Sequence, residues 1–126
     1  MIKELSYLVY PSEIKTISVE DDDTYGGAHN YFANKCLGFN NGETEYLRDE
    51  VVEIPFVKKL DDGTIVPGLQ SEQLVFVLLD RTVKLNERFP SVQNERIIEG
   101  LTMVLNACKD RVQDRLNRNV MGQLKK

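Results

Sequence analysis

The segment from Val92 to Val120 has a helical pattern of apolar residues into which polar side chains intrude. Eight apolar residues recur there at the 3.6-residue spacing that is typical of an amphipathic helix. They are Ile97, Ile98, Leu101, Val104, Leu105, Cys108, Val112 and Leu116. At about 100° per residue they form a stripe about 120° wide, and Asn94 and Arg115 fall inside that stripe. The helix is therefore expected both to pack against the rest of the protein and to bind a ligand or partner that carries negative charge.

Three arginines follow i, i+4, i+7 spacing and project from one side of this helix: Arg111, Arg115 and Arg118, here called the arginine face. A guanidinium on a core-facing surface costs free energy unless an anion or a planar group receives it. One interpretation is therefore a phosphate- or anion-binding face. The other is a charge cluster that the dipole at the helix C-terminus favours. Asp110 and Asp114 fall off the arginine face on the helical wheel and are expected to pair with it poorly.

Asn94 is also open to two interpretations. It lies three residues after Ser91 and can complete a cap at the helix N-terminus. It can instead belong to a ligand site, but Arg111 lies 17 residues later, about 25 Å along one helix. Two copies of the helix packed antiparallel about a twofold axis would bring Asn94 of one chain near Arg111 and Arg115 of the other. We therefore expect a dimer or a larger homo-oligomer with this helix at the interface.

Length and charge exclude several broad classes. The 126 residues are expected to form one domain, residues 1–126, and the net charge of −4 argues against general binding of duplex nucleic acid. No apolar run is long enough for a membrane span, and Met1–Tyr10 lacks the pattern of a secretory signal. We expect a cytoplasmic protein without membrane association. Cys36 and Cys108 are expected to be reduced and buried.

Periodicity changes at Pro67-Gly68 and predicts an α+β fold: an N-terminal antiparallel β-meander over residues 1–67, then an αα-hairpin over residues 68–126. Turn signals at Asn40-Asn41-Gly42 and Asp61-Asp62-Gly63 predict hairpins, the first of type I′. The expected strands are Leu5–Tyr10, Ile14–Val19, Asn30–Phe39, Glu43–Leu47, Val51–Leu60 and Thr64–Val66. Pro55 marks an edge position or a bulge.

Two helices are expected after the strands. Ser71 is expected to cap a helix that runs through Leu85 and buries Leu74, Val75, Leu78 and Leu79. After a tight turn at Glu87–Pro90, Ser91 is expected to cap the second helix.

The residues that could carry catalysis are few. His29 is the only histidine, and the sequence has no G-x-S-x-G motif, no P-loop and no dinucleotide-binding fingerprint. The acidic run Glu20–Asp23 lacks the ligand spacing of a calcium loop, so we expect neither a metal nor a cofactor. The chain is therefore not expected to be an enzyme. A small nucleotide-processing enzyme is the weakest interpretation.

The chain resembles the type-one anti-Thoeris sponge proteins of bacteriophages. The resemblance lies in the N-terminal sheet, in the segment Ser71-Glu72-Gln73-Leu74, and in a helical hairpin with Asn94, Arg111 and Arg115 at this spacing. These proteins share a hairpin domain with phage anti-CBASS sponges. The resemblance spans nearly the whole chain, and its specific part is the hairpin. It implies a non-catalytic protein that sequesters a cyclic ADP-ribose signal, notably a glycocyclic isomer, and so blocks Thoeris defence in the infected host cytoplasm.

The resemblance also implies an assembly and a set of site residues. Members form dimers that associate into hexamers, and some bind cyclic trinucleotides at separate sites. Carried over, Asn94 would contact the base or ribose, while Arg111 and Arg115, with Arg118 beside them, would hold the pyrophosphate. Phe89 and Tyr25 are the candidate aromatic platforms for the adenine, whereas Lys84 stands where a family aromatic is expected on the first helix. The alternative is a structural or interaction protein of the phage whose arginines dock subunits or an acidic partner.

Overall fold

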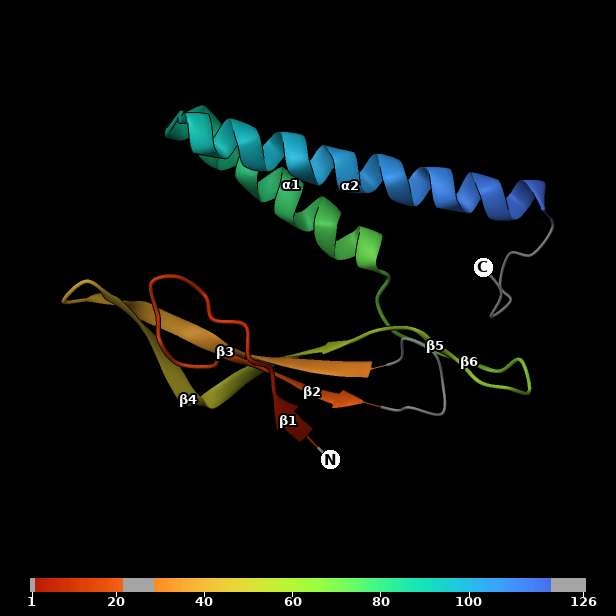
Figure 1. Ribbon diagram of the computed structural model, residues 1–126, viewed down its shortest axis with the longest axis horizontal. Helices are drawn as coiled ribbons and strands as arrows, with labels where there is room; N and C mark the ends of the chain where they lie inside the picture. The colour runs from red at the N-terminus through yellow and green to blue at the C-terminus, as the bar shows by residue number, and fades with distance from the viewer. Residues whose placement is uncertain (1, 22–28, 119–126) are drawn as a thin grey trace. The chain divides into compact units, whose positions relative to one another are not determined.

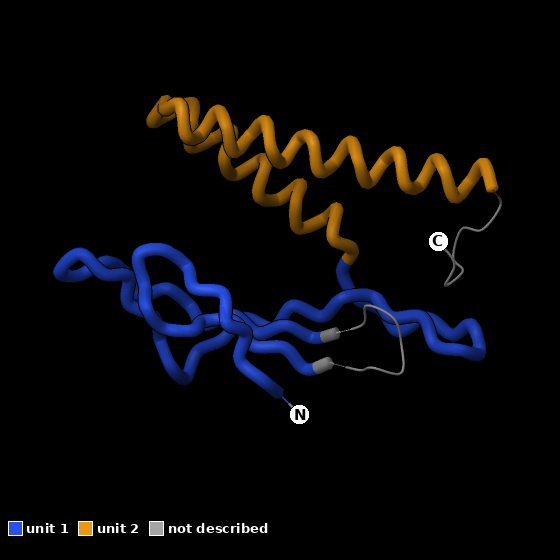
Figure 2. The backbone as a smooth tube through the Cα atoms, in the orientation of Figure 1, with its two compact units in different colours: residues 1–69 blue, residues 70–126 orange. Residues whose placement is uncertain are grey.

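The computed structural model describes residues 2–21 and 29–118. The chain folds into two compact units (Figure 2). Unit 1 comprises residues 1–69 and holds the strands, and unit 2 comprises residues 70–126 and holds two helices. The predicted α+β class, an antiparallel sheet followed by a helical hairpin, is confirmed (Figure 1). Neither helix, within the residues described, is long and apolar enough to cross a membrane.

Four strands of unit 1 form one antiparallel sheet in sequence order, so the predicted meander is confirmed. They are β1 (Ile2–Glu4), β2 (Ile17–Asp21), β3 (His29–Asn40) and β4 (Glu43–Pro55). The β3–β4 turn has the positive φ angles of a type I′ turn, 54° at Asn41 and 82° at Gly42, as the Asn-Gly step predicts. Pro55 ends β4, an outer strand of the sheet, so its edge position is also confirmed.

A large bulge interrupts the pairing of β3 with β4. Between the pairs Asn34↔Val51 and Cys36↔Tyr46, β3 has one residue and β4 has the four residues 47–50. The side-chain Nδ2 of Asn34 donates to the carbonyl oxygens of Leu47 at 2.9 Å and Arg48 at 3.4 Å, where ladder bonds are lost. The segments predicted as Glu43–Leu47 and Val51–Leu60 are therefore joined into one long, bent strand that ends at Pro55.

The prediction of a strand over Leu5–Tyr10 was wrong, because the first strand is Ile2–Glu4 and the next begins only at Ile17. Local hydrogen bonds hold the intervening chain. The backbone N–H of Ser12 donates to the carbonyl of Val9 at 2.8 Å, and the Ser12 Oγ accepts from the Ile14 N–H at 3.1 Å. These turn bonds compete with a sheet ladder and keep the segment out of regular pairing.

The second predicted hairpin is present as β5 (Lys58–Lys59) paired with β6 (Ile65–Val66). Its turn has Gly63 at a φ of 89°, and the Asp62 carboxylate accepts from the Thr64 N–H at 2.9 Å. The hydrogen bond from the Thr64 backbone lowers the pKa of Asp62 below its ordinary value. Thr64 itself lies outside β6, so the ladder is shorter than predicted.

Unit 2 is a pair of helices, α1 (Ser71–Arg88) and α2 (Val92–Asn117). The cap of α1 is Gln70 and not the predicted Ser71, because Gln73 Oε1 accepts from the Gln70 N–H at 2.8 Å and completes a capping box. The predicted cap of α2 is confirmed: Ser91 Oγ accepts from the Asn94 N–H at 3.0 Å.

The partly buried residues of α2 alternate four and three positions apart, which is the spacing of a coiled-coil seam. They are Asn94, Ile98, Leu101, Leu105, Cys108, Val112 and Arg115. The predicted apolar stripe is therefore split. Five of its eight residues are partly buried, whereas Ile97, Val104 and Leu116 are 48%, 43% and 55% exposed.

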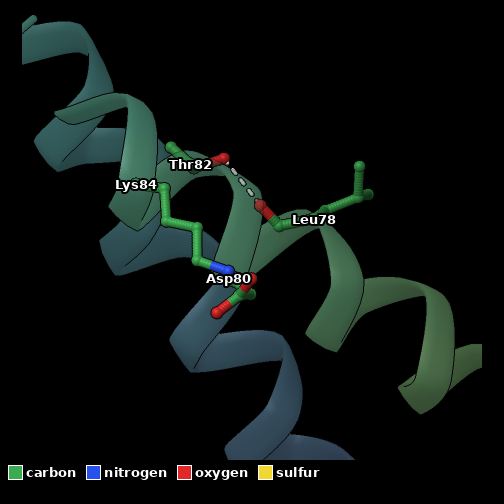
Figure 3. Close-up of polar contacts among 4 residues, drawn as sticks. All are labelled: Leu78, Asp80, Thr82 and Lys84. Atoms are coloured by element: carbon green, nitrogen blue, oxygen red, sulfur yellow. Dashed lines mark hydrogen bonds and ion pairs between the residues drawn. The ribbon is translucent and has the colours of Figure 1, made fainter. Parts of the chain in front are cut away.

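On α1 the partly buried side chains include Leu74, Val75 and Leu79, as predicted, and Thr82 is buried. The Thr82 hydroxyl donates to the Leu78 carbonyl at 2.7 Å (Figure 3). The prediction that Leu78 is buried was wrong, because its side chain is 50% exposed. The seam position that follows Leu79 belongs to Thr82, and Leu78 falls beside the seam.

Candidate anion-binding face on the second helix

The arginine face lies at the C-terminal end of α2, in the part of that helix that extends beyond α1. α2 has 26 residues and α1 has 18, and the helices form a hairpin (Figure 1). The eight additional residues correspond to about 12 Å of helix. Because only residues 89–91 join the two helices, this excess falls at the end of α2 that carries Arg115 and Arg118. These side chains therefore have no turn of α1 beside them.

Arg115 has the most demanding position of the three arginines. It continues the spacing of the α2 seam past the point where α1 begins and is partly buried, as the helical wheel predicts. Among residues 2–21 and 29–118, it has no ion-pair partner. Desolvation of a guanidinium without a counter-charge is unfavourable, so this side chain favours the approach of an anion.

Arg111 lies one turn before Arg115 and has a distant partner within the hairpin. Its Nη2 lies 3.9 Å from Oε1 of Glu72 on α1, and its side chain is 54% exposed. At that distance the two groups form an ion pair without a short hydrogen bond. Exposed ion pairs of this kind contribute about 0–1 kcal/mol to the free energy of unfolding. An entering phosphate could therefore compete with Glu72 for Arg111 at little cost.

Arg118 differs from the other two arginines. Its Nη2 lies 2.9 Å from Asp114 Oδ2, and its Nε donates to the same oxygen at 3.0 Å. The expectation that Asp114 pairs poorly with the arginine face was therefore wrong for Arg118. The i, i+4 spacing of the two residues was the available signal, and long side chains reach across an angular separation that the wheel measures only at Cβ. Arg118 is thus the least available of the three arginines for a ligand.

Asn94 and Phe89 form a second cluster at the opposite end of α2. The Asn94 Nδ2 donates to the Phe89 carbonyl at 3.1 Å, in addition to the cap bond of its backbone N–H. The capping interpretation of Asn94 is therefore realised. Phe89, whose carbonyl Asn94 binds, is 62% exposed. The Arg88 guanidinium carbon lies 5.4 Å from the centre of the Phe89 ring.

Asn86, which sequence reasoning missed, also binds the backbone of the loop between α1 and α2. Its Oδ1 accepts from the Ser91 N–H at 3.1 Å. An asparagine in the last turn of a helix, four residues before a Pro-Ser step, is the signal that could have identified it. Asn86 on α1 and Asn94 on α2 thus both hydrogen-bond to the backbone of the loop and stabilise the backbone position of Phe89.

One chain gathers the predicted site residues into two separate clusters. Phe89 and Asn94 lie at one end of α2 and the arginine face lies at the other, separated by about 25 Å of continuous helix. Tyr25 lies outside the described residues. A ligand of nucleotide size therefore contacts one cluster or the other within a single chain.

Lys84 pairs with Asp80 at 2.8 Å, which raises the pKa of Lys84 (Figure 3). Cys36 is exposed and Cys108 partly buried, so the expected burial of Cys36 was wrong, since it lies on the β3–β4 arm beyond the bulge. Within the part of the chain that the structure describes, no three histidine, cysteine or acidic residues cluster as a metal site would require.

Comparison with known proteins adds no further assignment. Neither the protein-family models nor the curated proteins contain a match to this chain.

Proposed function

We propose that this chain is a non-catalytic binding protein that sequesters a cyclic ADP-ribose-type signalling nucleotide, notably a glycocyclic isomer, in the cytoplasm of a phage-infected bacterium. By holding the signal it would block Thoeris defence. The observation that carries the proposal is Arg115, a partly buried guanidinium without an ion-pair partner among the described residues. The resemblance of the hairpin to anti-Thoeris sponges supplies the identity of the ligand.

The chemistry of the arginine face suits a pyrophosphate. Arg111 and Arg115 are one turn apart, so their Cβ atoms are about 5–6 Å apart and both guanidiniums reach the same small volume. Guanidinium–phosphate pairs are charge-assisted and frequently bidentate, which makes them stronger than neutral hydrogen bonds. A pyrophosphate would give Arg115 the counter-charge it lacks and would draw Arg111 away from Glu72, its partner at 3.9 Å.

The other cluster suits the nucleoside part of the same ligand. Phe89 offers an exposed ring for stacking, and the Asn94 amide offers hydrogen bonds to a base edge or a ribose hydroxyl. In the proposed dimer, two α2 helices run antiparallel, so each site combines Phe89 and Asn94 of one chain with Arg111 and Arg115 of the other. Two equivalent sites result from the twofold axis.

Exposed apolar residues beside the α1–α2 seam support self-association. They are Leu78 and Leu85 on α1, at 50% and 36% exposure, and Ile97 and Val104 on α2, at 48% and 43%. Contiguous apolar patches on soluble monomers are usually small, and larger ones mark interaction sites. The proposal includes further association of dimers into hexamers, as well as separate sites for cyclic trinucleotides, as in the proteins the chain resembles.

The second candidate is an interaction protein whose arginines dock a subunit or an acidic partner. The Arg118–Asp114 pair favours it, because that pair is an ordinary ion pair at a helix end and needs no ligand. Under this alternative, Arg115 would receive a carboxylate from a partner protein rather than a phosphate.

A release experiment distinguishes the proposals. The full chain is incubated with each cyclic ADP-ribose isomer, freed of unbound ligand, and denatured by heat, and the supernatant is analysed by liquid chromatography and mass spectrometry. We expect intact ligand from the parent and little from the Arg111→Ala, Arg115→Ala double variant. Altered product would indicate an enzyme. Recovery of no isomer from the parent would contradict the sponge proposal and leave the interaction protein.

A further inference from the structure

Unit 1 has a cavity that the function proposed above does not use. Its volume is about 500 Å³, within the range of about 300–1,000 Å³ that is typical of small-molecule sites. It is lined by Glu4, Ile14, Lys15, Asn34, Tyr46, Leu47 and Arg48. All of these residues belong to unit 1, and none of them belongs to the arginine face.

The β3–β4 bulge contributes much of the cavity wall. Three of the lining residues, Tyr46, Leu47 and Arg48, lie at or within the segment of β4 that departs from the ladder. Asn34 holds that segment through the two bonds from its Nδ2 to carbonyl oxygens. Bulges occur preferentially beside functional sites, where they redirect side chains. The wall is thus set by hydrogen bonds that exist without a ligand.

Two exposed cations line the cavity, and neither forms an ion pair among the described residues, with the Glu4 carboxylate of the same cavity or with any other. They are Lys15 and Arg48. Lys35 provides a contrast on the same sheet, because its Nζ lies 3.7 Å from Glu50 and it does not line the cavity. An ammonium and a guanidinium that line one cavity favour a phosphate group.

Two further lining residues, Asn34 and Glu4, offer acceptors. Both hydrogen bonds of the Asn34 side chain are donated by Nδ2, and its Oδ1 has no donor among the described residues. Glu4 adds a carboxylate, which accepts hydrogen bonds when ionised. Acceptors of this kind bind hydroxyl groups, and the partly buried Tyr46 ring offers an apolar face for C–H groups.

We propose that this cavity binds a sugar phosphate. Lys15 and Arg48 hold the phosphate, Asn34 Oδ1 and the Glu4 carboxylate accept from sugar hydroxyls, and the Tyr46 ring lies against the sugar carbons. A ligand without sugar hydroxyl groups would leave the Asn34 oxygen and the Glu4 carboxylate without these donors. Inorganic phosphate is therefore a poorer ligand than a phosphorylated sugar.

The test is calorimetric titration of the full chain with ribose 5-phosphate, inorganic phosphate and ribose. We expect ribose 5-phosphate to bind more tightly than either fragment. The Lys15→Gln, Arg48→Gln double variant should lose at least tenfold in affinity, and Glu4→Gln should reduce the preference over inorganic phosphate. Lys35→Gln is the matched control, because it removes a nearby cation outside the cavity, and its affinity should equal that of the parent.

Three results would overturn the proposal: no binding of ribose 5-phosphate by the parent, equal affinity for inorganic phosphate, or an equal loss in the Lys35→Gln control. The Arg111→Ala, Arg115→Ala variant separates this site from the proposed nucleotide site. It should bind ribose 5-phosphate as the parent does, even if no cyclic ADP-ribose isomer binds at all. Loss of ribose 5-phosphate binding in that variant would place the ligand on α2 and contradict the cavity assignment.

Discussion

Two inactive variants are expected to restore ligand binding when they are mixed. The first is Arg115→Ala, which removes the partly buried guanidinium, and the second is Asn94→Phe, which blocks the other cluster with a bulky ring. In the proposed dimer each site takes Asn94 from one chain and Arg115 from the other. A mixed dimer therefore has one site with both residues intact and one site with both residues altered.

The fraction of sites that should regain binding follows from the affinity lost in each variant and from the share of mixed dimers. Arg115→Ala removes one charge-assisted partner of a phosphate, which costs about 2–3 kcal/mol, or about 30- to 150-fold in affinity. Asn94→Phe blocks its cluster sterically, so each variant alone should bind weakly. When equal amounts exchange freely, about half of the dimers contain one chain of each kind. One of the two sites in such a dimer is intact, so about a quarter of all sites should bind as tightly as in the parent.

The assay is calorimetric titration of the mixture with the cyclic ADP-ribose isomer that the parent binds, after co-incubation to allow exchange. Asp110→Ala provides the control, because Asp110 lies off the arginine face and its loss should be nearly neutral. Thermal unfolding of each variant checks that it is folded. A mixture that binds no better than its components, while exchange is demonstrated, would refute a site shared between chains.

Other properties follow from the same structure. In size-exclusion chromatography with light scattering, the chain should elute as a dimer or a larger assembly, and a monomer at micromolar concentration would contradict the shared site. Ser91→Ala should lower the free energy of unfolding by about 1 kcal/mol in denaturant titrations, because Ser91 Oγ caps α2, whereas Ser71→Ala should have little effect because Gln70 caps α1. Asp62 should titrate below the ordinary aspartate pKa of about 3.9 in carboxyl-detected NMR, because Thr64 donates to its ionised form; this contribution to stability is present above that pH and is lost as the pH falls through the lowered pKa.

The features of the fold that could be predicted are those that local sequence determines. The Asn-Gly turn places β3 and β4 in register because two adjacent residues accept positive φ angles. The seam of α2 could be read from its periodicity, because a helix repeats its faces without reference to the rest of the chain. The Ser91 cap is likewise local, since its partner Asn94 lies three residues away.

The features that were missed depend on contacts distant in sequence or on side-chain reach. The bulge of β4 depends on Asn34, 13 residues before Leu47, and a window of strand propensity does not contain both residues. The cap of α1 was displaced by one residue because Gln73, a long side chain, reaches back to the Gln70 backbone. The candidate site was predicted to be shared between two copies of the second helix, because Asn94 and Arg111 lie about 25 Å apart on one helix. Its division into two clusters was also foreseen, because helical rise converts sequence separation directly into distance.

The scarcity of buried apolar side chains has a thermodynamic consequence. Val19, 2% exposed, is the one hydrophobic side chain that is buried among residues 2–20 and 30–118. A chain with so small an interior gains little free energy from folding alone, and the burial of its exposed leucines, valines and isoleucines against a partner adds to that gain. Folding and assembly would then be one coupled equilibrium governed by mass action. The unfolding temperature should rise with protein concentration, so that the amount of chain made in the cell sets the fraction that is folded.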